Sequence, residues 1–77
     1  MSTGAARLDA RGLQCPLPVL KAKKAMRTLA VGETLTVLAT DPAAPEDFRR
    51  FCEVTGHRME SLGENGGVYT LVLRRTQ

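Results

Sequence analysis

Residues 12–29, GLQCPLPVLKAKKAMRTL, place a cysteine directly before a proline-rich helix start. Gly12 breaks the chain after residues 7–10, a short alternating segment that is typical of a strand. Over residues 16–29 apolar side chains recur at helical spacing and predict one buried face, formed by Val19, Ala22, Ala25, Met26 and Leu29. The opposite side of this helix is basic and carries Lys21, Lys23, Lys24 and Arg27. The chain is therefore expected to begin as a strand followed by an amphipathic helix.

A second strand and a second helix follow. Residues 34–39, TLTVLA, are rich in β-branched side chains and alternate, which predicts a strand packed on one face. Both Thr40-Asp41-Pro42 and Ala44-Pro45-Glu46 are typical helix starts, because a short acceptor before a proline satisfies the opening turn. The helix is expected to run to about Thr55, with Gly56 as its left-handed cap. Its apolar face is predicted to contain Phe48, Phe51, Cys52 and Val54.

The last part of the chain predicts a β-hairpin. Residues 57–62 and 68–74 are strand candidates, and Asn65-Gly66 between them is expected to supply the positive φ angles of the turn. The order βαβαββ predicts an α+β fold. Its two crossovers imply parallel pairings and its hairpin an antiparallel one, so we expect a two-layer α/β sandwich with a mixed four-stranded sheet and two helices on one face. The 77 residues have the size of one domain, 1–77, in which residues 1–6 are expected to form a flexible N-terminus.

Composition narrows the classes of function. The 43% hydrophobic and 25% charged residues match an ordinary globular chain. Two cysteines and one histidine are too few for a closed zinc site, so no metal or cofactor is predicted. The net charge of +3 fits an acidic partner, but the sequence has few aromatic residues and no RNA-binding motif, so strong nucleic-acid binding is not expected. No segment has the length or composition of a signal peptide or a membrane span, which favours the cytoplasm.

Cys15 is the main candidate for chemistry. A thiol at a helix N-terminus lies in the positive end of the helix dipole, and Lys21 one turn later adds positive charge, so a modestly lowered pKa is expected. Pro16 and Pro18 stiffen the turn and Gly12 permits it, so the sulfur should be rigidly presented and exposed. The alternative is that Cys15 is a small apolar residue packed at the helix entrance.

The other candidates have weaker support. Cys52 shares a face with two phenylalanines and is expected in the core. No fixed spacing connects His57 with Cys15, which disfavours a Cys-His hydrolase, and Asp41 before a proline is expected to be a helix cap. Lys21, Lys24 and Arg27 form a solvated basic face that could orient an acidic partner.

The sequence resembles the TusA-like (SirA-like) sulfur carrier family. The resemblance lies in Leu8-Asp9-Ala10-Arg11-Gly12-Leu13-Gln14-Cys15-Pro16-Leu17-Pro18, since Cys-Pro-x-Pro at the start of the first helix is the family signature. It extends through Thr40-Asp41-Pro42, Phe51-Cys52 and Gly56-His57 to cover residues 8–75. Leu17 lies where the best-known tRNA-thiolation members carry glutamate. The family fold is also a βαβαββ two-layer sandwich.

The resemblance implies a sulfur carrier. Cys15 would receive sulfane sulfur as a persulfide from a cysteine desulfurase or a rhodanese-like donor. It would pass this sulfur to a DsrE-like or other relay protein, in tRNA thiolation, cofactor synthesis or sulfur oxidation. Such a protein is a sulfurtransferase-type carrier rather than a stand-alone enzyme. Two alternatives are a basic regulatory or RNA-binding module that does not use Cys15, and a thiol redox sensor.

Overall fold

The computed structural model describes residues 5–77, and their elements follow the predicted order βαβαββ. The elements are β1 (Ala5–Ala10), α1 (Leu17–Met26), β2 (Thr34–Ala39), α2 (Ala44–Thr55), β3 (Arg58–Asn65) and β4 (Val68–Arg74). β1 begins two residues before the predicted strand, so Ala5 and Ala6 belong to the sheet rather than to a flexible end. The remainder of the predicted flexible N-terminus, residues 1–4, lies outside the described residues.

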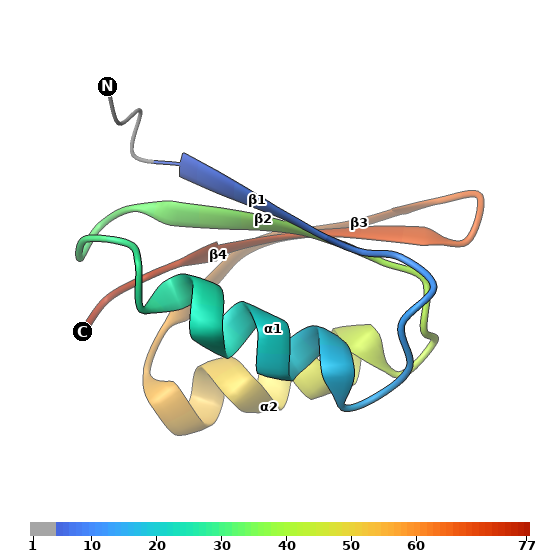
Figure 1. Cartoon of the computed structure of the whole chain (residues 1–77), viewed down its shortest axis with the longest axis horizontal. Coiled ribbons are helices and arrows are strands. Elements are labelled where there is room, and N and C mark those ends of the chain that lie inside the picture. Colours follow the sequence, from blue (N-terminus) through green and yellow to red (C-terminus); the bar gives the residue numbers. More distant parts are fainter. Residues whose placement is uncertain (1–4) are drawn as a thin grey trace.

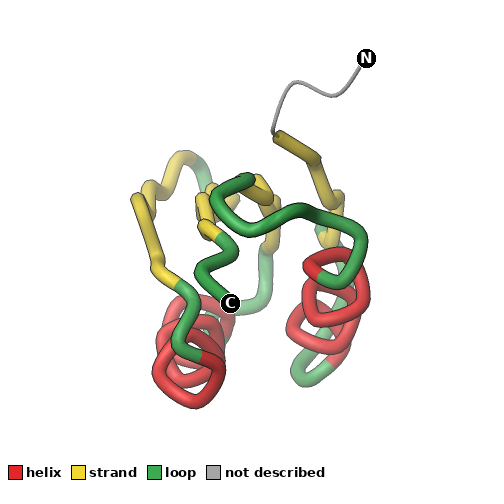
Figure 2. Tube along the Cα trace, turned by 90° about the vertical axis from the view of Figure 1, so that its left-hand side faces the viewer, coloured by secondary structure: helices red, strands yellow, loops and turns green. Residues whose placement is uncertain are grey.

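The four strands form one mixed sheet in the order β1-β2-β4-β3. β1 and β2 are parallel, whereas β4 is antiparallel to both β2 and β3. The prediction of a mixed sheet is confirmed, but the second crossover does not produce a parallel neighbour pair, because the hairpin returns β4 into the space between β2 and β3. Both helices lie on the same face of the sheet (Figures 1 and 2).

The core lies between this face and the two helices. Burial alternates along β2, with its buried residues Leu35, Val37 and Ala39 facing the helices. Leu71 and Leu73 of β4 and Phe48 of α2 are fully buried in the same cluster. Each large apolar side chain contributes about 1.5–3 kcal/mol when it is buried. Cys52 is buried as predicted, but Val54 was wrongly placed on the apolar face and is 80% exposed.

The first helix is shorter than the predicted 16–29. After Met26 the backbone tightens, since the N–H groups of Thr28 and Leu29 donate to the carbonyls of Ala25 and Met26. Such bonds between residues three apart are common at helix ends. Leu29 is nevertheless buried, which is why the apolar periodicity continues beyond the helix. Arg75 fixes this end, because its Nη1 donates to the carbonyls of Met26 and Leu29.

Glycines with positive φ close the second helix and the hairpin. Gly56 has φ +83° and caps α2, with its N–H donating to the Cys52 carbonyl, as predicted. The hairpin turn differs from the prediction, because its positive φ angles belong to Gly66 and Gly67. Asn65 instead pairs with Val68 as the last residue of β3, so this strand extends to the turn.

Candidate functional site

Cys15 lies in the loop that follows β1, at the carboxyl ends of the parallel strands β1 and β2. Two side chains that follow β2 hold this loop. The Gly12 N–H donates to Oγ1 of Thr40 at 2.9 Å, and the Cys15 N–H donates to Oδ2 of Asp41 at 2.5 Å. Parallel neighbours end at the same edge of a sheet, so the residues that follow each strand meet there. The site is therefore built by the pairing of β1 with β2.

The two prolines hold the start of α1 in different ways. Pro16, joined to Cys15 by a cis peptide bond, is the exposed residue before the helix, and Pro18 is buried in its first turn. The Leu17 N–H donates to the Gln14 carbonyl at 2.9 Å, so it is engaged within the loop. The Cys15 thiol itself is exposed, as predicted.

The pKa of the Cys15 thiol is raised, which corrects the predicted decrease. The main cause is a hydrogen bond from the thiol to the Asp47 carboxylate, followed by partial desolvation and by the negative charges of Asp47 and Asp41. Arg50 opposes these effects and lowers the pKa. The acidic side chains that enter from α2 and its preceding loop raise the pKa of the thiol, and the cation that acts on it is Arg50 rather than Lys21. The free protein therefore holds Cys15 mainly as a thiol at neutral pH.

A cleft of about 410 Å³ extends from Cys15 between the two helices. Its apolar lining includes Leu20, which is 53% exposed, and Val54. Lys23 and Arg50 add positive charge, and Asp47 lies beside the thiol. The lining comprises Cys15, Pro16, Val19, Leu20, Lys23, Asp47, Arg50, Phe51, Val54 and Thr55. The cleft thus presents a nucleophile next to an apolar surface with charged margins.

The structure separates the predicted basic residues. Lys21 and Lys24 are exposed on α1 but line neither of the two hollows beside this helix, whereas Lys23 lines both. Arg27 lines only the hollow at the far end of the helix. A docking role for Lys21, Lys24 and Arg27 therefore stays a prediction, and Lys23 is the basic residue of α1 that lies in the cleft with Cys15.

The contacts that Asp41, Asp47 and Arg50 make at Cys15 were not predicted from the sequence. Asp41 could have been identified, because it follows one strand of a parallel pair just as Cys15 follows the other. It was predicted to cap the second helix, but the residue that caps α2 is Ala43, whose N–H donates to Oδ1 of Asp41 at 3.0 Å. No sequence signal places Asp47 and Arg50 near Cys15, because their distance from the thiol depends on how α2 packs beside α1.

The remaining candidates lie away from Cys15. Cys52 is buried, and desolvation raises the pKa of its thiol. His57 lines the other hollow, so the structure does not bring it together with Cys15. Within residues 5–77, no three His, Cys, Asp or Glu side chains cluster as metal ligands would. Neither of the two described helices, α1 and α2, has the length of a membrane-spanning segment.

Comparison with known proteins identifies close relatives over almost the whole chain. The sequence model of the family described as Sulfurtransferase TusA matches residues 6–75. A protein of Neisseria meningitidis serogroup B is 54% identical over 67 residues, which are 87% of this chain and 90% of that protein. Sulfur carrier protein TusA of Allochromatium vinosum is 41% identical over 69 residues, covering 90% and 91%. The crystal structure of a SirA-like protein from Desulfitobacterium hafniense matches with a TM-score of 0.81 at 30% identity, covering 94% of this chain and 99% of that one.

Proposed function

The chain belongs to the TusA sulfurtransferase family, and from this premise we propose that it is a sulfur carrier that transports sulfane sulfur as a persulfide on Cys15. The observation that carries the proposal is the position of Cys15. Its thiol is exposed at the end of the interhelical cleft, while its backbone is held by Asp41. A sulfur that must enter the active site of another protein needs this combination of access and fixed position.

The transfer step requires only thiol chemistry. The Cys15 thiolate attacks the outer sulfur of a donor persulfide, a new S–S bond forms on Cys15, and the donor thiolate leaves with the electron pair of the broken bond. The second transfer repeats this exchange with an acceptor thiolate as the nucleophile. Each step breaks one S–S bond and forms another, so no external oxidant or reductant is consumed.

Because the pKa of Cys15 is raised, we expect the partner protein to help form the reactive thiolate. Only the thiolate is nucleophilic, and Asp47 raises the pKa of the thiol, so the small thiolate fraction of an ordinary cysteine at neutral pH is reduced further. A cationic group on a docked donor that pairs with Asp47 would weaken this effect and increase the thiolate fraction. The free carrier would then react slowly with unrelated electrophiles. In a complex with the donor, its thiol would react faster with the donor persulfide.

The proposed partners follow from the chemistry. The donor is a cysteine desulfurase or a rhodanese-like protein, because both present an enzyme-bound persulfide, and the acceptor is a DsrE-like or other relay protein with a reactive cysteine. The exposed Leu20 and Val54 supply apolar contact area, and Lys23 and Arg50 fit acidic groups on a partner. The cytoplasm is the proposed location, since a reducing compartment preserves the free thiol.

Intact-mass spectrometry tests the proposal. The protein is incubated with a cysteine desulfurase and cysteine, and we expect an addition of about one sulfur atom that a thiol reductant removes. The Cys15→Ser variant should not gain this mass, whereas the matched Cys52→Ser variant should gain it, because Cys52 is buried. Equal loading of both variants would refute the assignment of Cys15. A protein that forms a stable sulfenic acid with peroxide but accepts no sulfur from any donor would instead be a redox sensor.

A further inference from the structure

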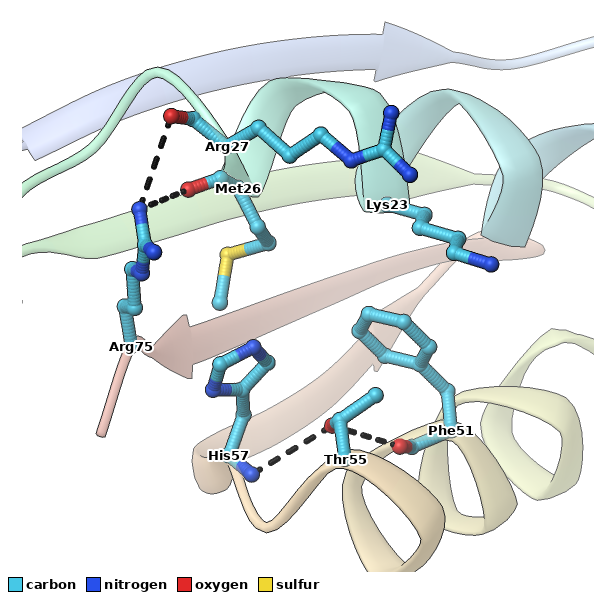
Figure 3. Close-up of a pocket in the computed structure, with 7 residues that line it drawn as sticks. All are labelled: Lys23, Met26, Arg27, Phe51, Thr55, His57 and Arg75. Atoms are coloured by element: carbon cyan, nitrogen blue, oxygen red, sulfur yellow. Dashed lines mark hydrogen bonds between the residues drawn. The ribbon is translucent and has the colours of Figure 1, made fainter. Parts of the chain in front are cut away.

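A second hollow of about 170 Å³ lies at the far end of the two helices from Cys15. Figure 3 shows Lys23 and Arg27 extending from α1 on one side, Phe51 and Thr55 from α2 on the other, and His57 and Arg75 at one end. Four of the lining residues are basic types, Lys23, Arg27, His57 and Arg75, and none is acidic. The hollow is therefore concave and is lined by basic side chains without an acidic one.

The basic side chains of the hollow differ in their partners. Within the described residues, Lys23 and Arg27 take part in no ion pair. Arg75 donates through Nη1 to the backbone carbonyls of Met26 and Leu29 and through Nε to the backbone oxygen of Gln77, so its guanidinium is already engaged within the chain. A cluster of uncompensated cations in a concave, partly apolar surface concentrates anions.

His57 lies at one end of this hollow (Figure 3). Its Nδ1 accepts the Thr76 N–H at 3.2 Å, so the neutral ring carries its proton on Nε2. Desolvation and then the charge of Arg75 lower the pKa of His57. The hollow that His57 lines is also lined by Lys23 and Arg27 from α1, by the uncharged Met26, Phe51 and Thr55, and by Arg75 after β4.

We infer that this hollow is a binding site for a small anion, held through its carboxylate or tetrahedral oxoanion group. The volume is below the about 300–1,000 Å³ of pockets for drug-sized ligands, so a compact anion fits and a nucleotide does not. Lys23 and Arg27 line the hollow and would provide donors to the anion, and Met26 and Phe51 would provide apolar contacts. Cys15 does not line this hollow, but Lys23, Phe51 and Thr55 line both the hollow and the Cys15 cleft, so the two are neighbours.

Two consequences connect the site with His57 and with the cleft. A bound anion stabilises the imidazolium, so it raises the pKa of His57, and by linkage the anion binds more tightly as the pH falls through that pKa. Lys23 also lines the Cys15 cleft, so an anion that pairs with it reduces the positive charge available to an acidic partner there.

NMR titration of His57 tests the inference, because it is the only histidine and its ring signal is unambiguous. The full chain is titrated with sodium sulfate and, separately, with sodium acetate, at an ionic strength kept constant with sodium chloride. We expect a saturable shift of the ring signal with at least one of these anions, and a higher His57 pKa at saturation than in chloride alone. A linear response that depends only on ionic strength, with an unchanged His57 pKa, would overturn the site.

A charge-matched pair of variants locates the anion. Arg27→Gln removes a lining cation, whereas Lys24→Gln removes the same charge from the same helix outside both hollows. We expect the dissociation constant to rise by about threefold in Arg27→Gln and to change little in Lys24→Gln. Lys23→Gln replaces Arg27→Gln if circular dichroism indicates that the latter fails to fold. Equal weakening by the lining and control variants would contradict the location, and retained binding in Cys15→Ser separates this result from the sulfur-carrier test.

Discussion

One carboxylate, that of Asp41, connects Cys15 to the start of the second helix. Its Oδ2 accepts the Cys15 N–H at 2.5 Å and its Oδ1 accepts the Ala43 N–H at 3.0 Å. The bonds from Ala43 and Cys15 hold the pKa of Asp41 below its usual value. The entrances of α1 and α2 are therefore fixed relative to each other by a side chain that belongs to neither helix.

Replacement of Asp41 by alanine should loosen both entrances. We expect the amide of Cys15 to exchange with solvent faster than in the wild type and the midpoint of thermal unfolding to fall, because two backbone donors lose their acceptor. Asp41→Asn keeps one acceptor oxygen and should give an intermediate result. Hydrogen exchange followed by NMR measures the effect at Cys15, and Glu53→Ala on the exposed side of α2 is the control. Unchanged exchange at Cys15 in Asp41→Ala would show that this bond does not fix the loop.

Asp47 should control the reactivity of the thiol. In Asp47→Asn we expect a lower pKa of Cys15 and faster alkylation at neutral pH, because the hydrogen-bonded negative charge that stabilises the protonated thiol is lost. Arg50→Gln should shift the pKa in the opposite direction. The rate of reaction with iodoacetamide as a function of pH gives the pKa of each variant.

A neighbouring carboxylate provides the control for Asp47. Glu46 also lies in the first turn of α2, but its carboxylate pairs with Arg49 at 3.0 Å. Glu46→Gln should therefore leave the alkylation profile close to that of the wild type. If Glu46→Gln and Asp47→Asn gave the same profile, the effect would reflect net charge rather than the contact with Cys15.

The order and type of the helices and strands could be predicted from the sequence, because these elements are short and regular. The alternation from Thr34 to Ala39 and the proline start and glycine end of the second helix are local signals, and each matches the structure. The end of α1 could not be predicted. Leu29 is buried by tertiary packing although the helix has already ended, and Arg75 from the other end of the chain fixes that turn. The position of β4 between β2 and β3 is likewise a non-local property.

The candidate site was predictable in its nucleophile but not in its electrostatics. The helix dipole and the charge of Lys21 were the charge effects that the local sequence offered, and both predicted a lowered thiol pKa. In the structure the pKa of the thiol is raised, because α2 brings Asp47 to the sulfur and Asp41 lies nearby. This effect was not predicted, because Asp41 was interpreted only as a cap. Two helices that pack side by side therefore determine the protonation of Cys15.

The pH dependence of stability should reveal His57. Its pKa in the folded protein lies below the ordinary 6.5, so the unfolded chain binds a proton first as the pH falls. Its contribution to stability is therefore complete above pH 6.5, and it is lost as the pH falls from 6.5 through the lowered pKa. Urea unfolding in chloride buffers across this range measures the free energy of unfolding. The variant His57→Gln should lack the slope, and an identical slope in this variant would assign it to another group.

Two glycine-to-alanine changes should have opposite effects on stability. Gly56 has φ +83° at the end of α2, so Gly56→Ala should lower the free energy of unfolding by about 1–2 kcal/mol. Gly63 lies within the exposed strand β3 without a positive φ, and a Cβ built there meets no atom within 4 Å. Gly63→Ala should therefore raise the free energy of unfolding by about 0.4–1 kcal/mol, because alanine restricts the unfolded chain at no cost to the folded one. Urea denaturation of both variants measures these changes, and a loss of stability in Gly63→Ala comparable to that in Gly56→Ala would mean that backbone conformation is not what distinguishes the two positions.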